Sequence, residues 1–171
     1  MTDQMATAQP LAGDVAPDFT LPDDTSTSRR LSDQHGKWVI LYFYPTDDTP
    51  GCTTEACSFR DANDEIEERD AVVWGVSHLG VGSKAAFKAK YKLPFVLLAD
   101  EEHAVADSYG VWVEKNNYGK KYMGIARATF LVDPDGKVAR TWPKVKADGH
   151  AEEVLAALDE ERTARSALQT A

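Results

Sequence analysis

The apolar residues of the chain gather into short continuous runs, of which residues 38–44 are the first. A run of strand-favouring apolar residues without polar alternation is typical of a strand buried on both faces of a sheet. Pro45 ends this run. A second run of the same kind covers residues 71–77. A helix is expected between them, to about residue 68, so the pattern predicts a right-handed parallel βαβ unit.

The segment between the two runs predicts a helix that begins just before a cysteine. Thr49 is the expected N-cap, and Pro50 suits the first helical position because its missing N–H would have no partner there. Cys52 then lies in the first turn, where free backbone N–H groups and the helix dipole favour negative charge. Because the thiolate is the nucleophilic form, the sequence predicts a reactive cysteine.

Further along the chain the same reasoning predicts three helices, three strands and a loop. The helices are expected at residues 83–92, 102–109 and 150–168, and the strands at 94–100, 126–132 and 137–142. A Pro-Asp-Gly turn joins the last two strands into a hairpin. Residues 110–119 are expected to include a loop. Residues 1–10 are expected to be a disordered tail before one folded domain at 11–171, and the lysines of the helix at 83–92 to lie on its solvated face.

Composition limits the classes of function. With 171 residues and a hydrophobic fraction of 43%, the chain fits a single globular domain. Its formal charge of −9 argues against nucleic-acid binding, which needs a basic surface. The N-terminal residues lack the features of a signal peptide, and no apolar run approaches the length of a membrane span. We therefore expect a cytoplasmic protein that binds neither nucleic acid nor membrane.

The two cysteines, Cys52 and Cys57, could be buried hydrophobes, a static disulfide or a redox pair. On an intact helix, residues five apart have Cα atoms about 8–9 Å apart, whereas a disulfide needs about 7 Å or less. A bond between them would therefore require the helix start to unwind and would mark a second conformation. The histidines lack the spacing of metal ligands, so no metal site is expected.

The residues from Pro45 to Cys52 form a longer motif, in which Pro is followed after three residues by Thr and after two more by Cys. This motif resembles the active site of peroxiredoxins, and Cys57 five positions on resembles the peroxiredoxin Q or bacterioferritin comigratory protein subgroup. The resemblance implies that Cys52 is the peroxidatic cysteine and Cys57 the resolving one. It makes Thr49 the hydroxyl that bonds thiolate and peroxide, and Pro45 the cover that limits water access.

The resemblance also implies a thioredoxin-like α/β fold, with a central mixed β-sheet flanked by helices in one domain. Residues 11–21 are similar to the segment with which such proteins enter the fold. The family usually has a glycine-containing hairpin next, but no glycine occurs between Pro22 and Leu31. The geometry of this hairpin is left open.

Arg127 is the third candidate catalytic residue. Asp47 and Asp48 lie beside the thiol in sequence and should disfavour a thiolate if they face it, so a fixed cation is needed. Arg127 lies at the start of a predicted strand and offers several donors in a rigid fork. The sequence alone leaves an exposed strand-end arginine equally open, and the resemblance to the peroxiredoxin active-site arginine favours catalysis. Arg60 is expected to pair with a helix carboxylate.

The predicted function is a thiol-dependent peroxidase that reduces hydrogen peroxide and organic hydroperoxides. The resemblance implies a Cys52 sulfenic acid, an intramolecular disulfide with Cys57, recycling by thioredoxin and a monomer, without metal, haem or flavin. A thioredoxin-like disulfide oxidoreductase is disfavoured because a Cys-x-x-Cys motif is absent. A redox-sensing or holdase binding protein without catalytic turnover stays open as the alternative.

Overall fold

A mixed sheet of five strands forms the centre of this computed structural model, which describes residues 8–169. In spatial order the strands are β5 (Val96–Ala99), β4 (Ala71–Ser77), β3 (Trp38–Phe43), β8 (Ala128–Val132) and β9 (Val138–Trp142). β3, β4 and β5 run parallel, and β8 and β9 run antiparallel to their neighbours. The predicted βαβ unit, hairpin and fold class are thereby confirmed.

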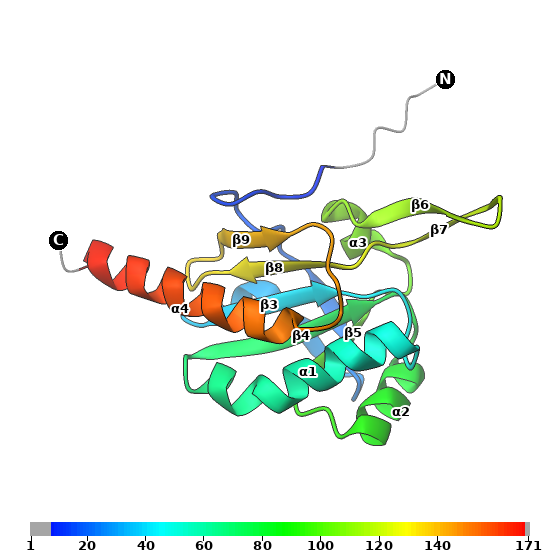
Figure 1. Cartoon of the computed structure of the whole chain (residues 1–171), viewed down its shortest axis with the longest axis horizontal. Helices are drawn as coiled ribbons and strands as arrows, with labels where there is room; N and C mark the ends of the chain where they lie inside the picture. The colour runs from blue at the N-terminus through cyan, green and yellow to red at the C-terminus, as the bar shows by residue number, and fades with distance from the viewer. Residues whose placement is uncertain (1–7, 170–171) are drawn as a thin grey trace.

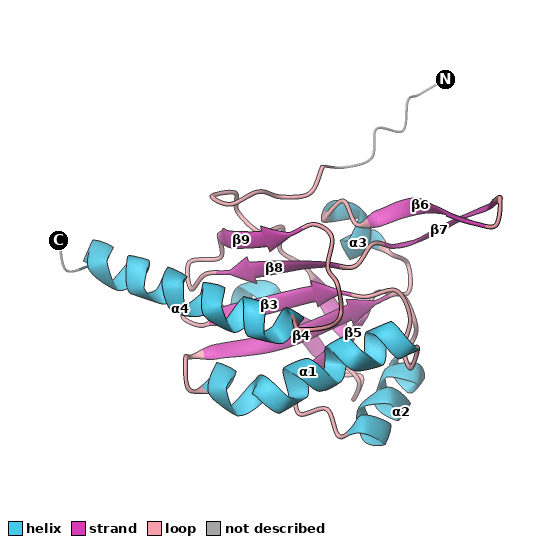
Figure 2. Cartoon of the chain, in the orientation of Figure 1, coloured by secondary structure: helices cyan, strands magenta, loops and turns pink. Residues whose placement is uncertain are grey.

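Helices cover both faces of this sheet (Figures 1 and 2). They are α1 (Pro50–Glu67), α2 (Val81–Tyr91), the short α3 (Ala104–Ser108) and α4 (His150–Gln169). α1 and α4 lie together across one face, and α3 lies on the other. Within residues 8–169, none of the helices is both long and apolar enough to cross a membrane.

β3 is the strand that joins the two halves of the core. All of its residues are buried, and they alternate between the two faces. Val39, Leu41 and Phe43 pack in the cluster that includes α3, whereas Ile40 and Tyr42 pack in the cluster that includes α1 and α4. The continuous apolar run in the sequence therefore did indicate a strand buried on both faces.

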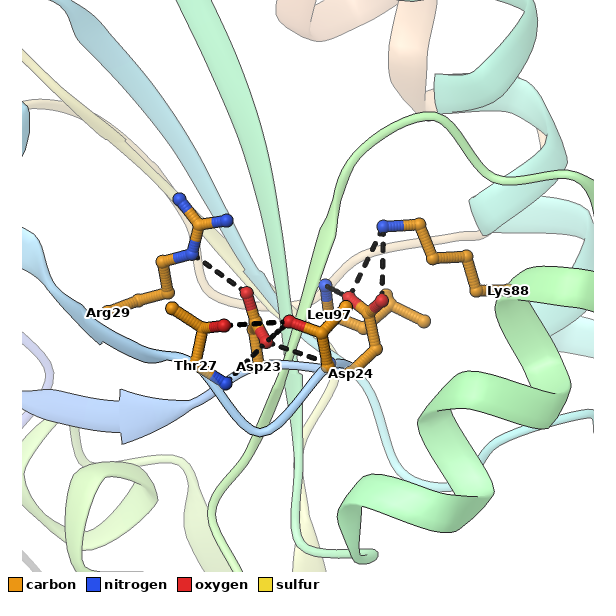
Figure 3. Close-up of polar contacts among 7 residues, drawn as sticks. Asp23, Asp24, Thr27, Arg29, Lys88 and Leu97 are labelled. Carbon is orange, nitrogen blue, oxygen red and sulfur yellow. Dashed lines mark hydrogen bonds and ion pairs between the residues drawn. The ribbon is translucent and has the colours of Figure 1, made fainter.

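The hairpin left open by the sequence does form, without glycine. β1 (Thr20–Pro22) pairs with β2 (Ser28–Arg30), and a 3-10 helix, η1 (Leu31–Gln34), follows. The carboxylate of Asp23 replaces the missing glycine as the organising group, because it accepts hydrogen bonds from the backbone N–H of Thr25 and Thr27 and from Arg29 (Figure 3). Ser26 takes the left-handed conformation at the tip, with φ 65°.

The expectation of a loop within residues 110–119 is wrong for most of these residues. β6 (Trp112–Asn117) and β7 (Lys120–Ile125) form an antiparallel hairpin that projects from the body of the protein (Figure 1). Its two-residue turn has positive φ at both Tyr118 (52°) and Gly119 (82°), as a type I′ turn requires. The hairpin is largely exposed, so its residues carry no apolar alternation from which a strand could be predicted.

The predicted tail lies mostly outside the described residues. Residues 8–10 have no regular secondary structure, and Pro10 is buried. The chain then joins the body through a hydrogen bond from the N–H of Gly13 to the carbonyl oxygen of Val138. The other predicted helices and strands agree with the structure to within a few residues at each end.

Candidate active site

The loop between β3 and α1 places Cys52 at the start of α1. Thr49 has the extended backbone of an N-cap, with φ −98° and ψ 157°, and Pro50 occupies the first helical position. Cys52 is only 1% exposed, and Cys57 is partly buried further along the same helix. Both thiols are free. Because α1 is continuous across both residues, a bond between the two sulfurs requires its first turns to unwind.

Arg127 is brought to Cys52 by the pairing of β3 with β8. Phe43, at the end of β3, lies opposite Ala128, so Arg127 sits beside the point where the chain leaves the sheet for α1. Its NH2 nitrogen donates to the Cys52 sulfur at 3.2 Å. A side chain on Gly51 would place a Cβ only 3.1 Å from this nitrogen, so glycine permits the close approach.

Glu55 is the second partner of Arg127 and was not singled out in the sequence. Its Oε1 accepts from NH1 of Arg127 at 2.6 Å, while Oε2 is buried without a hydrogen-bond partner. Burial raises the pKa of Glu55 to about 7, although the charge and hydrogen bond of Arg127 act to lower it. The sequence contained one signal that could have indicated Glu55, which is its helical spacing. Glu55 follows Cys52 by three residues and so lies on the same face of α1.

Asp47 does not depend on Arg127 for charge compensation. Its carboxylate accepts hydrogen bonds from the hydroxyls of Tyr44 and Ser83 and from the ammonium group of Lys84, at 3.2 and 3.3 Å. Lys84 is fully buried, so its predicted place on a solvated helix face is wrong. The physical reason is its position one turn before the buried Phe87, on the side of α2 that faces the sheet.

Asp48 is paired with the other end of α2. Lys90 donates to its carboxylate at 2.7 Å, and so does the hydroxyl of Tyr91. Arg60 pairs with Asp61, as expected, and also donates to the carbonyl oxygen of Tyr91. Lysines of α2 thus pair with the two aspartates, while Arg127 lies against the Cys52 sulfur, where a cation was expected, and also pairs with Glu55.

Thr49 and Pro45 lie on either side of these aspartates in the same loop. Both are partly buried. The hydroxyl of Thr49 donates to the carbonyl oxygen of Thr46 at 3.2 Å and makes no capping bond to α1. Their roles in binding peroxide and excluding water stay predictions. In the described part of the chain, no three side chains among His, Cys, Asp and Glu converge to hold a metal ion.

Residues 12–141 match the AhpC/TSA family model. The chain belongs to this family. A putative peroxiredoxin bcp of Coxiella burnetii is 53% identical over 146 residues, covering 85% of this chain and 97% of that protein. The peroxiredoxin Bcp of Bacillus subtilis is 49% identical over 146 residues, covering 85% and 93%. The predicted family is thus confirmed, and with it the class of enzyme, a peroxiredoxin.

Solved structures of peroxiredoxins share the fold. The bacterioferritin comigratory protein of Xanthomonas campestris superposes with a TM-score of 0.80 at 41% identity, covering 84% of this chain and 91% of that one. A PrxQ mutant of Xylella fastidiosa superposes with a TM-score of 0.82 at 35% identity, covering 94% and 99%. The thioredoxin-like arrangement predicted for this peroxiredoxin is therefore confirmed as well.

Proposed function

We propose that this peroxiredoxin reduces hydrogen peroxide and organic hydroperoxides through a sulfenic acid on Cys52, which Cys57 then resolves. The observation that carries the proposal is the contact of Arg127 with the Cys52 sulfur at 3.2 Å. A fixed cation beside a buried thiol stabilises the thiolate and can also bond a peroxide oxygen. The solved Xanthomonas campestris protein is described as having alkyl peroxide reduction activity, which supports the inclusion of organic hydroperoxides.

In the first step the Cys52 thiolate attacks the terminal peroxide oxygen. The S–O bond forms as the O–O bond breaks, the sulfur is oxidised by two electrons, and water or an alcohol leaves after taking up a proton. The donors for the charge that moves along the O–O bond are Arg127, Thr49 and the N–H of Cys52. This N–H has no partner within the helix because it belongs to the first turn.

In the second step the start of α1 unwinds and the Cys57 thiol condenses with the sulfenic acid. A disulfide forms and water is released. A dithiol reductant, for which we propose thioredoxin, then transfers two electrons and restores both thiols. The enzyme is proposed to act as a cytoplasmic monomer with a single folded domain that begins near residue 11. Neither metal nor organic cofactor takes part in this scheme.

The deciding experiment is the intact mass of the reduced protein after one equivalent of hydrogen peroxide. Wild type should lose a pair of hydrogens, Cys57→Ser should gain one oxygen, and Cys52→Ser should not change. Turnover with thioredoxin and its reductase should then be lost in both variants. Oxidation of wild type without repeated turnover would instead indicate a redox-sensing binding protein, and an unchanged wild-type mass would exclude an activated Cys52.

A further inference from the structure

A buried ion pair next to the active site has no part in the mechanism above. The ammonium group of Lys84 is completely buried and lies 3.2 Å from a carboxylate oxygen of Asp47, which is itself 8% exposed. Lys84 also donates to the hydroxyl of Ser77, and its charge lies over the ring of Tyr44, 5.2 Å from the centroid. Polar and aromatic groups thus surround both charges.

Such a pair is sensitive to the loss of either member. A buried charge is strongly disfavoured unless a partner compensates it, and removal of one partner leaves the other uncompensated. Burial lowers the pKa of Lys84, and the charge and hydrogen bond of Asp47 oppose this effect. The carboxylate and the ammonium group therefore hold each other in place.

The pair connects α2 to the loop that leads to Cys52. Asp47 lies in this loop between Pro45 and Thr49, and Lys84 lies in the first turns of α2. The next residue, Asp48, has the left-handed conformation, with φ 59°, which a residue with a side chain adopts at a cost. The contacts of this loop with α2 help to hold this conformation.

The ion pair that Asp48 makes with α2 is weaker than that of Asp47. The side chains of Asp48 and Lys90 are 40% and 58% exposed, and exposed ion pairs stabilise by only about 0–1 kcal/mol. Asp47, with the ammonium group of Lys84 and the hydroxyl of Ser83 as its partners on α2, is therefore the main polar anchor of the loop.

We propose that the Asp47–Lys84 ion pair is a positioning device that holds the start of α1 wound and so determines how the Cys52 sulfenic acid is consumed. This inference rests on the proposed function. With the loop anchored, the sulfenic acid stays in the wound site, where a second peroxide can oxidise it to sulfinic acid and release water or alcohol. When the start of α1 unwinds, Cys57 reaches the sulfenic acid and forms the disulfide with release of water.

Loss of the anchor should therefore favour the disulfide. We expect Lys84→Met and Asp47→Asn each to lower the fraction of sulfinic acid formed per turnover by about tenfold, since a broken buried pair is strongly destabilising. Both substitutions keep the approximate size of the side chain. Each should also slow the first step, because Thr49 is no longer held.

The sign of the two effects separates positioning from simple electrostatics. Lys84→Met leaves an extra negative charge near Cys52, whereas Asp47→Asn leaves an extra positive one. A purely electrostatic role would thus change the reaction of Cys52 with peroxide in opposite directions in the two variants. A positioning role lowers the sulfinic fraction in both variants, and it lowers the rate of the reaction with peroxide in both variants.

The same helix supplies a matched control. Lys88, one turn after Lys84, pairs at 3.2 Å with Asp24, whose side chain is 6% exposed (Figure 3). This pair fastens α2 to the β1–β2 hairpin and does not touch the Cys52 loop. Lys88→Met and Asp24→Asn should lower thermal stability while leaving the sulfinic fraction at the wild-type value.

The measurement is the ratio of sulfinic acid to disulfide by intact mass, after a single oxidation of the reduced protein over a series of hydrogen peroxide concentrations without a reductant, together with the rate of the first step. An unchanged ratio in both anchor variants, or equal shifts in the Lys88 and Asp24 controls, would overturn the inference while leaving the proposed function intact. Wild type that forms neither product would overturn the proposed function itself.

Discussion

The NH2 nitrogen of Arg127 lies 3.2 Å from the sulfur of Cys52, although 75 positions separate the two residues in the sequence. The register of β3 against β8 produces this contact, and Gly51 leaves space for the guanidinium. The second arm of the same guanidinium binds Glu55. One rigid side chain therefore joins the thiol to a buried carboxylate.

Arg127→Ala should slow the reaction of Cys52 with hydrogen peroxide by a factor of about 10²–10³, the range for loss of one donor to a developing charge. Arg127→Lys keeps the charge but loses the forked pair of donors, so its rate should lie between the rates of wild type and Arg127→Ala. Because the substitution also leaves Glu55 unpaired, Arg127→Ala should be compared with the double variant that adds Glu55→Gln. Stopped-flow kinetics measure the rates. Arg140→Ala, which removes a half-buried arginine paired with Glu160 and Glu161 on α4, should react like wild type.

Thr49→Val should slow the same step while leaving the fold intact. Valine has nearly the shape of threonine but lacks the hydroxyl, which we expect to turn from the carbonyl of Thr46 toward the peroxide. A hydrogen bond to a charged group is worth about 1.5–3 kcal/mol, so a loss of about 10–100-fold is expected. Thr49→Ser retains the hydroxyl and should stay within a few-fold of wild type. Equal rates for the valine and serine variants would exclude the role of the hydroxyl.

Glu55 should make the stability of the protein depend on pH. Its pKa is about 7 in the folded protein against an ordinary value of 4.5, so the folded state holds a proton that the unfolded chain has lost between these pH values. The stabilising contribution of the protonated form is complete below about pH 4.5 and is lost as the pH rises through about 7.

Glu55→Gln removes this dependence. Relative to wild type, its free energy of unfolding should therefore rise by about 3 kcal/mol from pH 4.5 to pH 8. Urea unfolding of both proteins across this range measures the difference. Replacing the exposed Glu102 by Gln should change stability by no more than about 0.5 kcal/mol. A difference between Glu55→Gln and wild type that does not change with pH would show that folding leaves the pKa of Glu55 unchanged.

Gly75→Ala should destabilise the sheet. A Cβ at this position of β4 would lie 2.8 Å from the ring of Tyr42, which is buried and cannot move aside freely. Overpacking of this kind costs about 1–3 kcal/mol. Gly82→Ala in α2 is the matched control, because its Cβ would meet nothing within 4 Å and alanine favours a helix. Thermal unfolding should show a lower midpoint for the first variant and an equal or higher one for the second.

The parts of the fold that could be predicted are those with strong local signals. The apolar runs of β3 and β4, the cap and proline before Cys52, and the Pro-Asp-Gly turn before β9 each determine their structure within a few residues. The β6–β7 hairpin could not be predicted in this way, because exposed strands show no apolar pattern and its turn depends on Tyr118 taking a positive φ.

The residues of the candidate site also fall into those with a local sequence signal and those without one. Cys52, Thr49 and Pro45 belong to one continuous motif, and the motif together with the family resemblance pointed to Arg127. Glu55 and Lys84 were missed because charged residues on a helix are normally solvated, and only packing against the sheet shows that both are buried. Lys84 had one signal in the sequence, its position on the same side of the helix as Phe87.

The continuity of α1 through Cys52 and Cys57 limits how far the thermal stability of this peroxiredoxin can be raised without a loss of activity. In the proposed mechanism, the first turns of the helix form to activate Cys52 and unwind to let Cys57 reach it. Substitutions that stabilise the helical conformation of these turns would raise the melting temperature of the protein and slow its catalytic cycle. Selection for heat resistance should therefore act on α4 and the sheet, and leave the helical turns at residues 50–57 only marginally stable.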